Sequence, residues 1–202
     1  MPPETRTAAI LLAAGESSRM GRAKQLLDFG GKPLLRHAAE VAFAAGCWPV
    51  VVVLGARGEL LRTALAGLPV EITINERWAE GMGTSIQAGL RALEDHDVTG
   101  AILMLAVQPF VSPEFLSRLA ASHRETSKSI VAARYEGTVG VPVFFAPGAF
   151  PLLMALQPSQ GCKGVILANQ PDALLVDCPE AAIDIDTPED YARATTPHQQ
   201  PH

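Results

Sequence analysis

Short apolar segments of strand length alternate along this sequence with stretches whose apolar residues recur at helical spacing. The strand-length segments comprise residues 8–12, 50–54, 70–74 and 101–105, with shorter ones at 129–133 and 142–145. Between the first four lie helical patterns at 33–45, 58–66 and 84–93. This alternation is typical of parallel strands joined by helices. It predicts an α/β fold: a three-layer arrangement of a mostly parallel sheet with helices on both faces.

Two Ser/Thr-Pro-Glu sequences predict where later helices begin. In Ser112-Pro113-Glu114 and in Thr187-Pro188-Glu189-Asp190, a hydroxyl can cap unpaired backbone amides while proline supplies the φ angle of the first turn. Proline has a different consequence at Pro142, where it lacks the N–H that a central strand donates. We therefore expect the segment 142–145 to lie at a sheet edge or to begin at Pro142.

Composition excludes several classes of protein. Hydrophobic residues make up 48% of the 202 residues and charged residues 18%, with no apolar run of the roughly 20 residues that a membrane-spanning helix needs. A disordered chain and a membrane-spanning one are both excluded. The net charge of −5 comes without a Lys/Arg-rich block, which argues against nucleic acid binding. The length predicts a single domain over 1–194, followed by a mobile tail at 195–202.

The three cysteines, Cys47, Cys162 and Cys178, are scattered and form no C-x-x-C motif. This pattern argues against a disulfide framework or a zinc site and favours inert thiols in a reducing compartment. The N-terminal sequence shows no signal-peptide cleavage pattern, so we expect the protein in the cytoplasm.

Residues 12–24 form the most informative segment, because they follow the first predicted strand directly. In a doubly wound sheet, the loop after that strand lies at the carboxyl edge, where ligands bind. Small residues at 13–15 would let backbone amides approach a phosphate or a base, and Arg19 and Lys24 would neutralise its charge. The segment is not a Walker loop, since Arg22 follows Gly21, and it lacks the G-x-G-x-x-G spacing of dinucleotide-binding proteins.

The sequence LAAGESSRMGRAK at 12–24 resembles the signature of nucleotidyltransferases, in particular the molybdenum-cofactor nucleotidyltransferases. The likeness continues through 75–85, Gln108-Pro109, 140–142 and 184–191, and so extends over residues 8–192. It implies the nucleotide-diphospho-sugar transferase type of Rossmann-like fold, with a nucleoside triphosphate and Mg²⁺ bound at the carboxyl edge of the sheet. The reaction that it implies releases pyrophosphate.

The resemblance also implies roles for the residues of this first motif. It assigns the base and ribose to Leu12, Ala13, Ala14 and Gly15. It assigns the triphosphate to Arg19 and Lys24, which we take as the catalytic residues because two cations could stabilise charge on the departing pyrophosphate. In the family, alanine at the position of Ala14 accompanies cytidylyl transfer and glycine accompanies guanylyl transfer. We therefore expect CTP rather than GTP.

A second motif, at 75–85, adds candidate nucleotide contacts at the start of a predicted helix. Backbone amides and hydroxyls there would face an anion or a base, and the candidates are Asn75, Gly81, Gly83 and Ser85. Thr84 and Ser85 are equally explained as ordinary helix caps, and both roles can coexist. For Trp78 we favour a place in the core, since most aromatic side chains serve burial.

Asp184 and Asp186 alternate with Ile185, so both carboxylates project to one face of an extended segment while Ile185 enters the core. Two carboxylates on one face suit Mg²⁺, which usually takes substrate phosphates as further ligands. The resemblance also assigns metal binding to this region, with Asp186 as the preferred ligand. Alternatively, the charge of Asp186 stabilises the start of the following helix without any metal.

One position departs from the family pattern. The family usually has an Asp immediately before Gln-Pro that holds the catalytic magnesium, whereas this chain has Val107 before Gln108-Pro109. Valine has no oxygen to offer a hard cation. Three interpretations remain: loss of activity, a metal held by Asp184 and Asp186 alone, or a homologue kept for binding rather than turnover.

The acceptor site is defined by fewer residues. Val141 stands where the cofactor enzymes often carry a polar residue, between Gly140 and Pro142, and Lys163 is a candidate anion contact. The leading hypothesis is transfer of CMP from CTP to the phosphate of the molybdopterin form of the molybdenum cofactor. The alternatives are a non-catalytic nucleotide- or cofactor-binding chaperone that delivers the cofactor to a molybdenum hydroxylase, and a nucleotidyltransferase with another phosphate acceptor.

Overall fold

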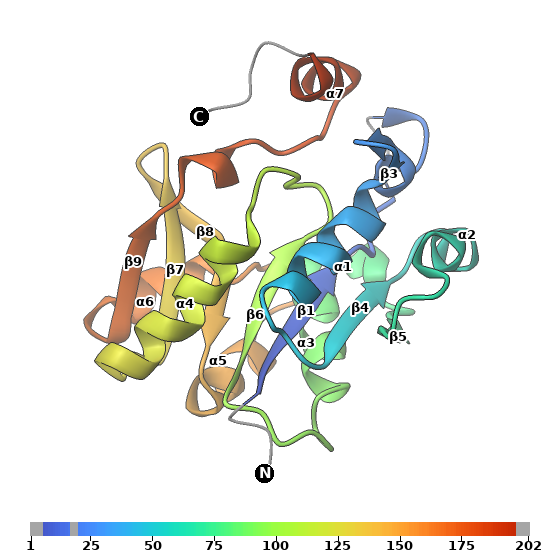
Figure 1. The fold of residues 1–202 in the computed structure, drawn as a ribbon. Helices are drawn as coiled ribbons and strands as arrows, with labels where there is room; N and C mark the ends of the chain where they lie inside the picture. The colour runs from blue at the N-terminus through green and yellow to red at the C-terminus, as the bar shows by residue number, and fades with distance from the viewer. Residues whose placement is uncertain (1–5, 17–19, 197–202) are drawn as a thin grey trace.

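A seven-stranded sheet forms the centre of the molecule, as the computed structural model shows for residues 6–16 and 20–196 (Figure 1). The strands are ordered β5-β4-β1-β6-β8-β7-β9 across the sheet. Their bounds are Thr7–Leu12 (β1), Val50–Leu54 (β4), Glu71–Ile74 (β5), Gly100–Leu105 (β6), Ile130–Tyr135 (β7), Thr138–Phe145 (β8) and Ala173–Asp177 (β9). A small hairpin, β2 (Asp28–Phe29) and β3 (Lys32–Pro33), lies outside it.

The sheet is mostly parallel, as the alternation of segments predicts. β1 pairs in parallel with β4 and β6, β4 with β5, and β7 with β9, whereas β8 runs antiparallel to both of its neighbours. The two faces of β1 are buried in different clusters, with Ala9 and Leu11 on one side and Ala8 and Ile10 on the other. Burial of both faces explains why this strand reads as a continuous apolar run rather than an alternating one.

Helices cover both faces and give three layers, which confirms the predicted fold class. On the face of Ala9 and Leu11 lie α1 (Leu34–Ala44), α2 (Gly58–Arg62) and α4 (Pro113–Thr126). On the opposite face lie α3 (Met82–Arg91), α5 (Phe150–Met154) and α6 (Lys163–Ala168). Among the described residues, 6–16 and 20–196, no helix has both the length and the apolar character to cross a bilayer.

At both predicted helix starts, a hydroxyl side chain caps the helix as expected. The Ser112 hydroxyl accepts a hydrogen bond from the Phe115 amide at the start of α4. At the start of α7 (Pro188–Thr195), the Thr187 hydroxyl accepts from the Asp190 amide, and the Asp190 carboxylate accepts from the Thr187 amide. Such a reciprocal capping box satisfies two amides that have no partner within the helix. The helix includes the first residue of the predicted tail, and residues 197–202 lie outside the described part.

The prediction for Pro142 is wrong. The strand that contains it, β8, begins four residues earlier and lies between β6 and β7, not at an edge. The register between β7 and β8 shifts there: Gly140 pairs with Ala133, whereas Val143 pairs with Ala132. Val141 and Pro142 fall in this irregularity, so the missing N–H of proline interrupts no regular ladder.

α7 lies above the carboxyl ends of the central strands (Figure 1). It is reached through the segment 178–187, which we call the strap, and it docks through Tyr191, whose hydroxyl donates to the Asp28 carbonyl in the β2–β3 hairpin. Within the strap, Ile185 is fully buried and packs with Leu27 and Leu34. The chain's C-terminal segment is thereby brought to the edge of the sheet where the loop after β1 lies.

Candidate nucleotide-binding site

A cavity of about 460 Å³ opens at the carboxyl edge of the sheet, between the ends of β1 and β6. It is lined by most of the predicted site residues, namely Leu12, Ala13, Ala14, Gly15, Lys24, Gly81, Ser85, Asp184 and Asp186. Residues from three distant segments, 12–24, 81–85 and 184–186, therefore meet at one place. Ligands of open α/β sheets bind at this edge, so the cavity is the candidate nucleotide site.

The loop after β1 is held in place by a residue that the sequence interpretation did not single out. Gln25, with an exposed fraction of 2%, donates from its side-chain nitrogen to the carbonyls of Ala13 (3.1 Å) and Gly15 (2.9 Å). The loop is also tied to the sheet, since the Ala13 amide donates to the Val53 carbonyl. No sequence pattern marks Gln25 for this role, because glutamine is mostly exposed in proteins and its partners here are brought near only by the fold.

Lys24 connects the first motif to the last. Its ammonium forms an ion pair with the carboxylate of Asp186 across 162 positions of sequence. The pair lies at the wall of the cavity, where both residues contribute to the lining. A phosphate in the cavity would therefore meet a cation that is already positioned by a carboxylate. Arg19, the second predicted cation, lies outside the described residues, so its role stays a prediction.

The two aspartates lie next to each other at the cavity, on either side of buried Ile185, as the alternating pattern predicts. The Ile185 amide donates to the Val107 carbonyl (3.0 Å), which fixes the strap against the end of β6. Surrounding protein atoms and the nearby Asp186 carboxylate raise the pKa of Asp184 to about 6, although the Gln108 amide and Lys24 oppose this shift. Asp184 thus carries a carboxylate whose charge is poorly compensated by the protein.

These residues fit a divalent cation with few protein ligands. Val107 lines the cavity where the family usually has an Asp, and it offers no side-chain oxygen. Within 6–16 and 20–196, no group of three or more His, Cys, Asp or Glu side chains is placed to hold a metal. Asp184 and Asp186 remain, and two carboxylates completed by substrate phosphates are a usual donor set for Mg²⁺. A cation beside Asp184 would also favour its ionised form, against the burial and the Asp186 charge that raise its pKa.

The structure places Asn75 behind the cavity rather than in its lining. Its buried side-chain nitrogen donates to the hydroxyls of Thr84 and Ser85, both at 2.9 Å, and its oxygen accepts from the Arg77 amide. Asn75 therefore orients Ser85, which does line the cavity. The Thr84 hydroxyl donates to the loop carbonyls of Arg77 and Gly81, and α3 has no side-chain cap, so the capping alternative is wrong for Thr84.

The two glycines of the second motif allow a close approach of another loop. A Cβ atom on Gly83 would lie 2.4 Å from the Gln157 carbonyl oxygen, and one on Gly81 would lie 2.5 Å from that of Pro158. The Gly83 amide donates to the Pro158 carbonyl. Gly81 lines the cavity, whereas Gly83 does not. The structure thus explains Gly83 by the close packing of the loop at 157–160. Trp78 is half-buried; it packs against the core, as predicted, and it also lines the cavity.

The predicted acceptor residues do not line the cavity. Gly140 and Pro142 are buried within β8, where a Cβ on Gly140 would lie 2.5 Å from the Tyr135 hydroxyl. The glycine makes room for that tyrosine. Lys163 begins α6 and borders a separate groove that it shares with Leu152 of α5. Sequence reasoning placed these residues together because the topology of β8 and the course of α5 and α6 were not predicted.

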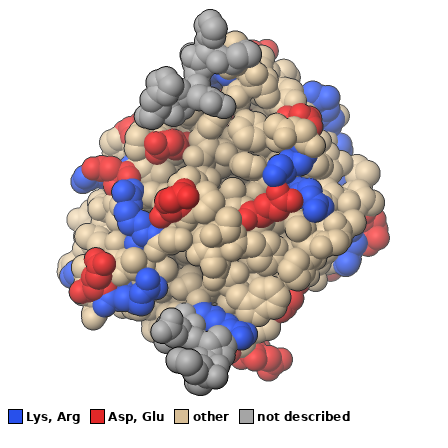
Figure 2. All heavy atoms as spheres, in the orientation of Figure 1, with Lys and Arg blue, Asp and Glu red and all other residues tan. Residues whose placement is uncertain are grey.

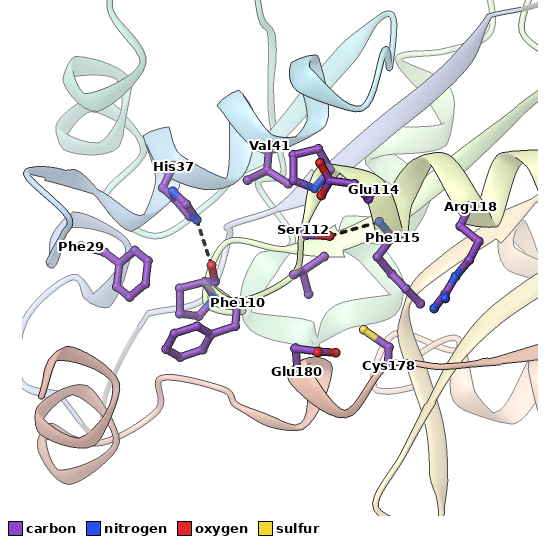
Figure 3. A pocket seen from close by; sticks show the side chains of 13 residues that line it. Phe29, His37, Val41, Phe110, Ser112, Glu114, Phe115, Arg118, Cys178 and Glu180 are labelled. Carbon is purple, nitrogen blue, oxygen red and sulfur yellow. Dashed lines mark hydrogen bonds between the residues drawn. The ribbon is translucent and has the colours of Figure 1, made fainter. Parts of the chain in front are cut away.

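Two further hollows adjoin the strap. One, of about 390 Å³, is called the acidic hollow and shares Asp184 and Asp186 with the nucleotide cavity. Its other lining residues are Phe110, Glu136, Ala182, Ile183, Asp190, Arg193 and Ala194. The other, of about 660 Å³, is called the aromatic hollow and lies between α1, the start of α4 and the strap (Figure 3).

Phe110 lines both hollows. In the aromatic hollow its ring meets that of Phe29 edge to face, with centroids 5.5 Å apart, and His37 bonds to the neighbouring Pro109 carbonyl (Figure 3). Glu180 points into the same hollow from the strap (Figure 3). Acidic and basic side chains are interspersed over the face drawn in Figure 2, without a large block of either sign.

The sheet, its crossover helices and the cavity at its carboxyl edge define an α/β fold of the nucleotide-diphospho-sugar transferase type. The model of the MobA-like NTP transferase domain matches residues 9–173. This chain belongs to that family, as the resemblance in its motifs predicted.

The similarity to individual relatives extends over nearly the whole chain. Nicotine blue oxidoreductase of Paenarthrobacter nicotinovorans is 32% identical over 91% of this chain and 94% of its own length. Purine catabolism protein PucB of Bacillus subtilis is 29% identical over 90% of this chain and 92% of its own length. Among solved structures, Rv0371c of Mycobacterium tuberculosis superposes with a TM-score of 0.82 at 30% identity, covering 94% of this chain and 97% of that one. A second structure of Rv0371c is described as a complex with manganese.

Proposed function

We propose that this protein transfers CMP from CTP to the terminal phosphate of the molybdopterin form of the molybdenum cofactor and releases pyrophosphate. The observation that carries the proposal is the meeting of the loop after β1, Lys24 and the two strap aspartates around one cavity in a MobA-like NTP transferase domain. Each of these features suits a different part of a nucleoside triphosphate.

In this proposal the loop 12–15 receives the base and ribose, because its residues line the cavity and their small side chains leave room for a ligand. Ala14 at its centre favours CTP over GTP. Lys24, together with Arg19, holds the triphosphate and stabilises the charge that builds up on the departing pyrophosphate. The ion pair with Asp186 keeps the Lys24 ammonium at the cavity wall before the nucleotide arrives.

Asp184 and Asp186 would hold a divalent cation, which we propose to be Mg²⁺. When bound, such a cation neutralises phosphate charge and orients the phosphates. An oxygen of the acceptor phosphate attacks the α-phosphorus of CTP, a phosphoanhydride forms, and the bond to the β-phosphate breaks. This reaction needs mainly positioning and charge stabilisation from protein groups, and Lys24, Asp184 and Asp186 are placed to supply both.

The cellular setting is proposed on the same basis. A finished cofactor dinucleotide would pass to a molybdenum hydroxylase, which makes such an enzyme a partner. The three cysteines are buried and unpaired, which suits a reducing compartment such as the cytoplasm. An oxidoreductase activity, as in the name of the Paenarthrobacter relative, has no support from the loop after β1, since that loop lacks the glycine spacing of dinucleotide-binding proteins.

Val107 favours a second candidate function. Because Val107 replaces the Asp that usually holds the catalytic metal, the chain can bind a nucleotide or the finished cofactor and deliver it without turnover. This chaperone is distinguished from the enzyme by tight binding without Mg²⁺-dependent release of pyrophosphate. An enzyme that uses another phosphate acceptor would release pyrophosphate, but not with molybdopterin.

The test compares two lysines that each form an ion pair. Lys24→Met removes the proposed triphosphate cation, whereas Lys32→Met removes the cation that pairs with Glu40 on α1, away from the cavity. We expect Lys24→Met to lower CTP-dependent pyrophosphate release by about 100-fold or more, and Lys32→Met to leave it unchanged. Equal rates for the two variants would overturn the proposed role of the cavity.

A further inference from the structure

We propose that the acidic hollow is the acceptor site, and that Phe110 and Glu136 recognise a planar ring bearing several N–H donors. The proposal rests on the proposed nucleotidyl transfer and assigns the acceptor to residues other than Gly140, Pro142 and Lys163. The class of acceptor that it defines is a phosphorylated, N–H-rich heterocycle.

Position is the first reason. Asp184 and Asp186 line both the nucleotide cavity and the acidic hollow, so the two spaces meet at these carboxylates. In phosphorus transfer the attacking and leaving oxygens lie roughly in line on opposite sides of the phosphorus. A nucleotide that places its phosphates near Lys24 therefore leaves the opposite side of the two aspartates for the acceptor. The acidic hollow is the neighbouring space that shares both aspartates with the nucleotide cavity.

The lining of the hollow limits what can occupy it. Its volume of about 390 Å³ falls within the range of small-molecule sites. Ionised carboxylates accept hydrogen bonds and donate none, and Glu136 adds a further carboxylate to those of the aspartates. Arg193, the cation among the lining residues, is paired with Asp190. Such a lining favours a ring whose edge donates hydrogen bonds.

Phe110 supplies the apolar surface for such a ring. It is half-buried, it follows Gln108-Pro109 at the end of β6, and its ring is supported by Phe29. Planar rings bind well against aromatic side chains in offset or edge-to-face arrangements. Glu136 lies at the exposed turn between β7 and β8 and lines the hollow. A ring on Phe110 would present its edge to this carboxylate.

The aromatic hollow is the rival location, and it permits a matched control. It is larger and shares Phe110, but neither Asp184 nor Asp186 lines it. Its carboxylate on the strap is Glu180. Removing one glutamate from each hollow therefore separates the two locations, since Glu136 lines only the acidic hollow and Glu180 only the aromatic one.

The experiment measures binding of a fluorescent pterin that carries a phosphate ester to the full chain, by fluorescence anisotropy, with CTP present. We expect Glu136→Ala to raise the Kd for the pterin about tenfold or more, Phe110→Leu to raise it several-fold, and Glu180→Ala to leave it unchanged. Weaker binding through Glu180→Ala alone, equal binding by all variants, or no binding by the unaltered chain would overturn the proposal.

The Kd for CTP is measured on the same samples. We expect it to be unchanged by Glu136→Ala, because this glutamate does not line the nucleotide cavity. Failure of the unaltered chain to bind CTP would contradict the proposed function, whereas loss of the Glu136 effect with intact CTP binding would contradict the acceptor site alone.

Discussion

Gln25→Leu tests whether the loop after β1 must be held in shape to bind a nucleotide. The substitution keeps a buried side chain of similar length but removes the nitrogen that donates to the carbonyls of Ala13 and Gly15. Ala13 is buried, so its carbonyl loses its donor without gaining water, whereas Gly15 is exposed and its carbonyl can be hydrated. We therefore count one unsatisfied buried acceptor, which costs about 1–3 kcal/mol.

For a chain of this size, that loss lowers Tm by roughly 2–12 °C. Loosening the loop also adds an ordering cost to nucleotide binding, and we expect the Kd for CTP to rise about tenfold, the equivalent of 1.4 kcal/mol. Thermal unfolding and isothermal titration calorimetry measure the two effects on the same protein.

Gln87 provides the matched control. It is also buried, and its side-chain nitrogen donates to two backbone carbonyls, those of Met154 and Leu156, but it does not line the nucleotide cavity. Gln87→Leu should therefore lower Tm by a similar amount while leaving the Kd for CTP unchanged. An unchanged CTP affinity in Gln25→Leu, or an equal loss of affinity in both variants, would refute the reasoning.

Three further outcomes follow from the structure. Burial raises the pKa of each cysteine thiol to about 11 or 12, so all three should resist iodoacetamide at pH 8 in the folded protein and react once it is unfolded. Gly83→Ala should lower Tm because its Cβ would lie 2.4 Å from a carbonyl oxygen, whereas Gly148→Ala, with open space around it, should not. Asp186→Asn should lower the pKa of Asp184, since it removes the neighbouring charge, as NMR titration would show. Because folding raises the pKa of Asp184 to about 6, its contribution to stability is largest below pH 4 and is lost as the pH rises through 6; Asp186→Asn should reduce this loss in pH-dependent unfolding.

The central strands and the outline of the site could be predicted because their signals are local. The apolar run that forms β1 is buried on both faces, and the loop that follows such a strand lies at the ligand-binding edge by topology alone. Alternation around Ile185 likewise predicted that Asp184 and Asp186 would share a face, which they do at the cavity wall.

The second half of the sheet was harder to predict because its order depends on distant pairing. β9 was not among the predicted strands. β8 is inserted antiparallel between β6 and β7. Pro142 is therefore central although proline usually marks an edge, since a local irregularity removes the need for its N–H. The support given by Gln25 and Asn75 could not be inferred from spacing, because each acts on backbone or side chains that only the folded chain brings near.

The central claim, that this cavity transfers a nucleotide, is tested most directly by pyrophosphate release. The unaltered chain and Val107→Asp are each supplied with Mg²⁺, CTP or GTP, and molybdopterin. We expect CTP-dependent release that exceeds release with GTP, and a faster rate after Val107→Asp because a carboxylate returns to the end of β6 beside Asp184 and Asp186. No pyrophosphate from either protein with either nucleotide would contradict the proposed transfer.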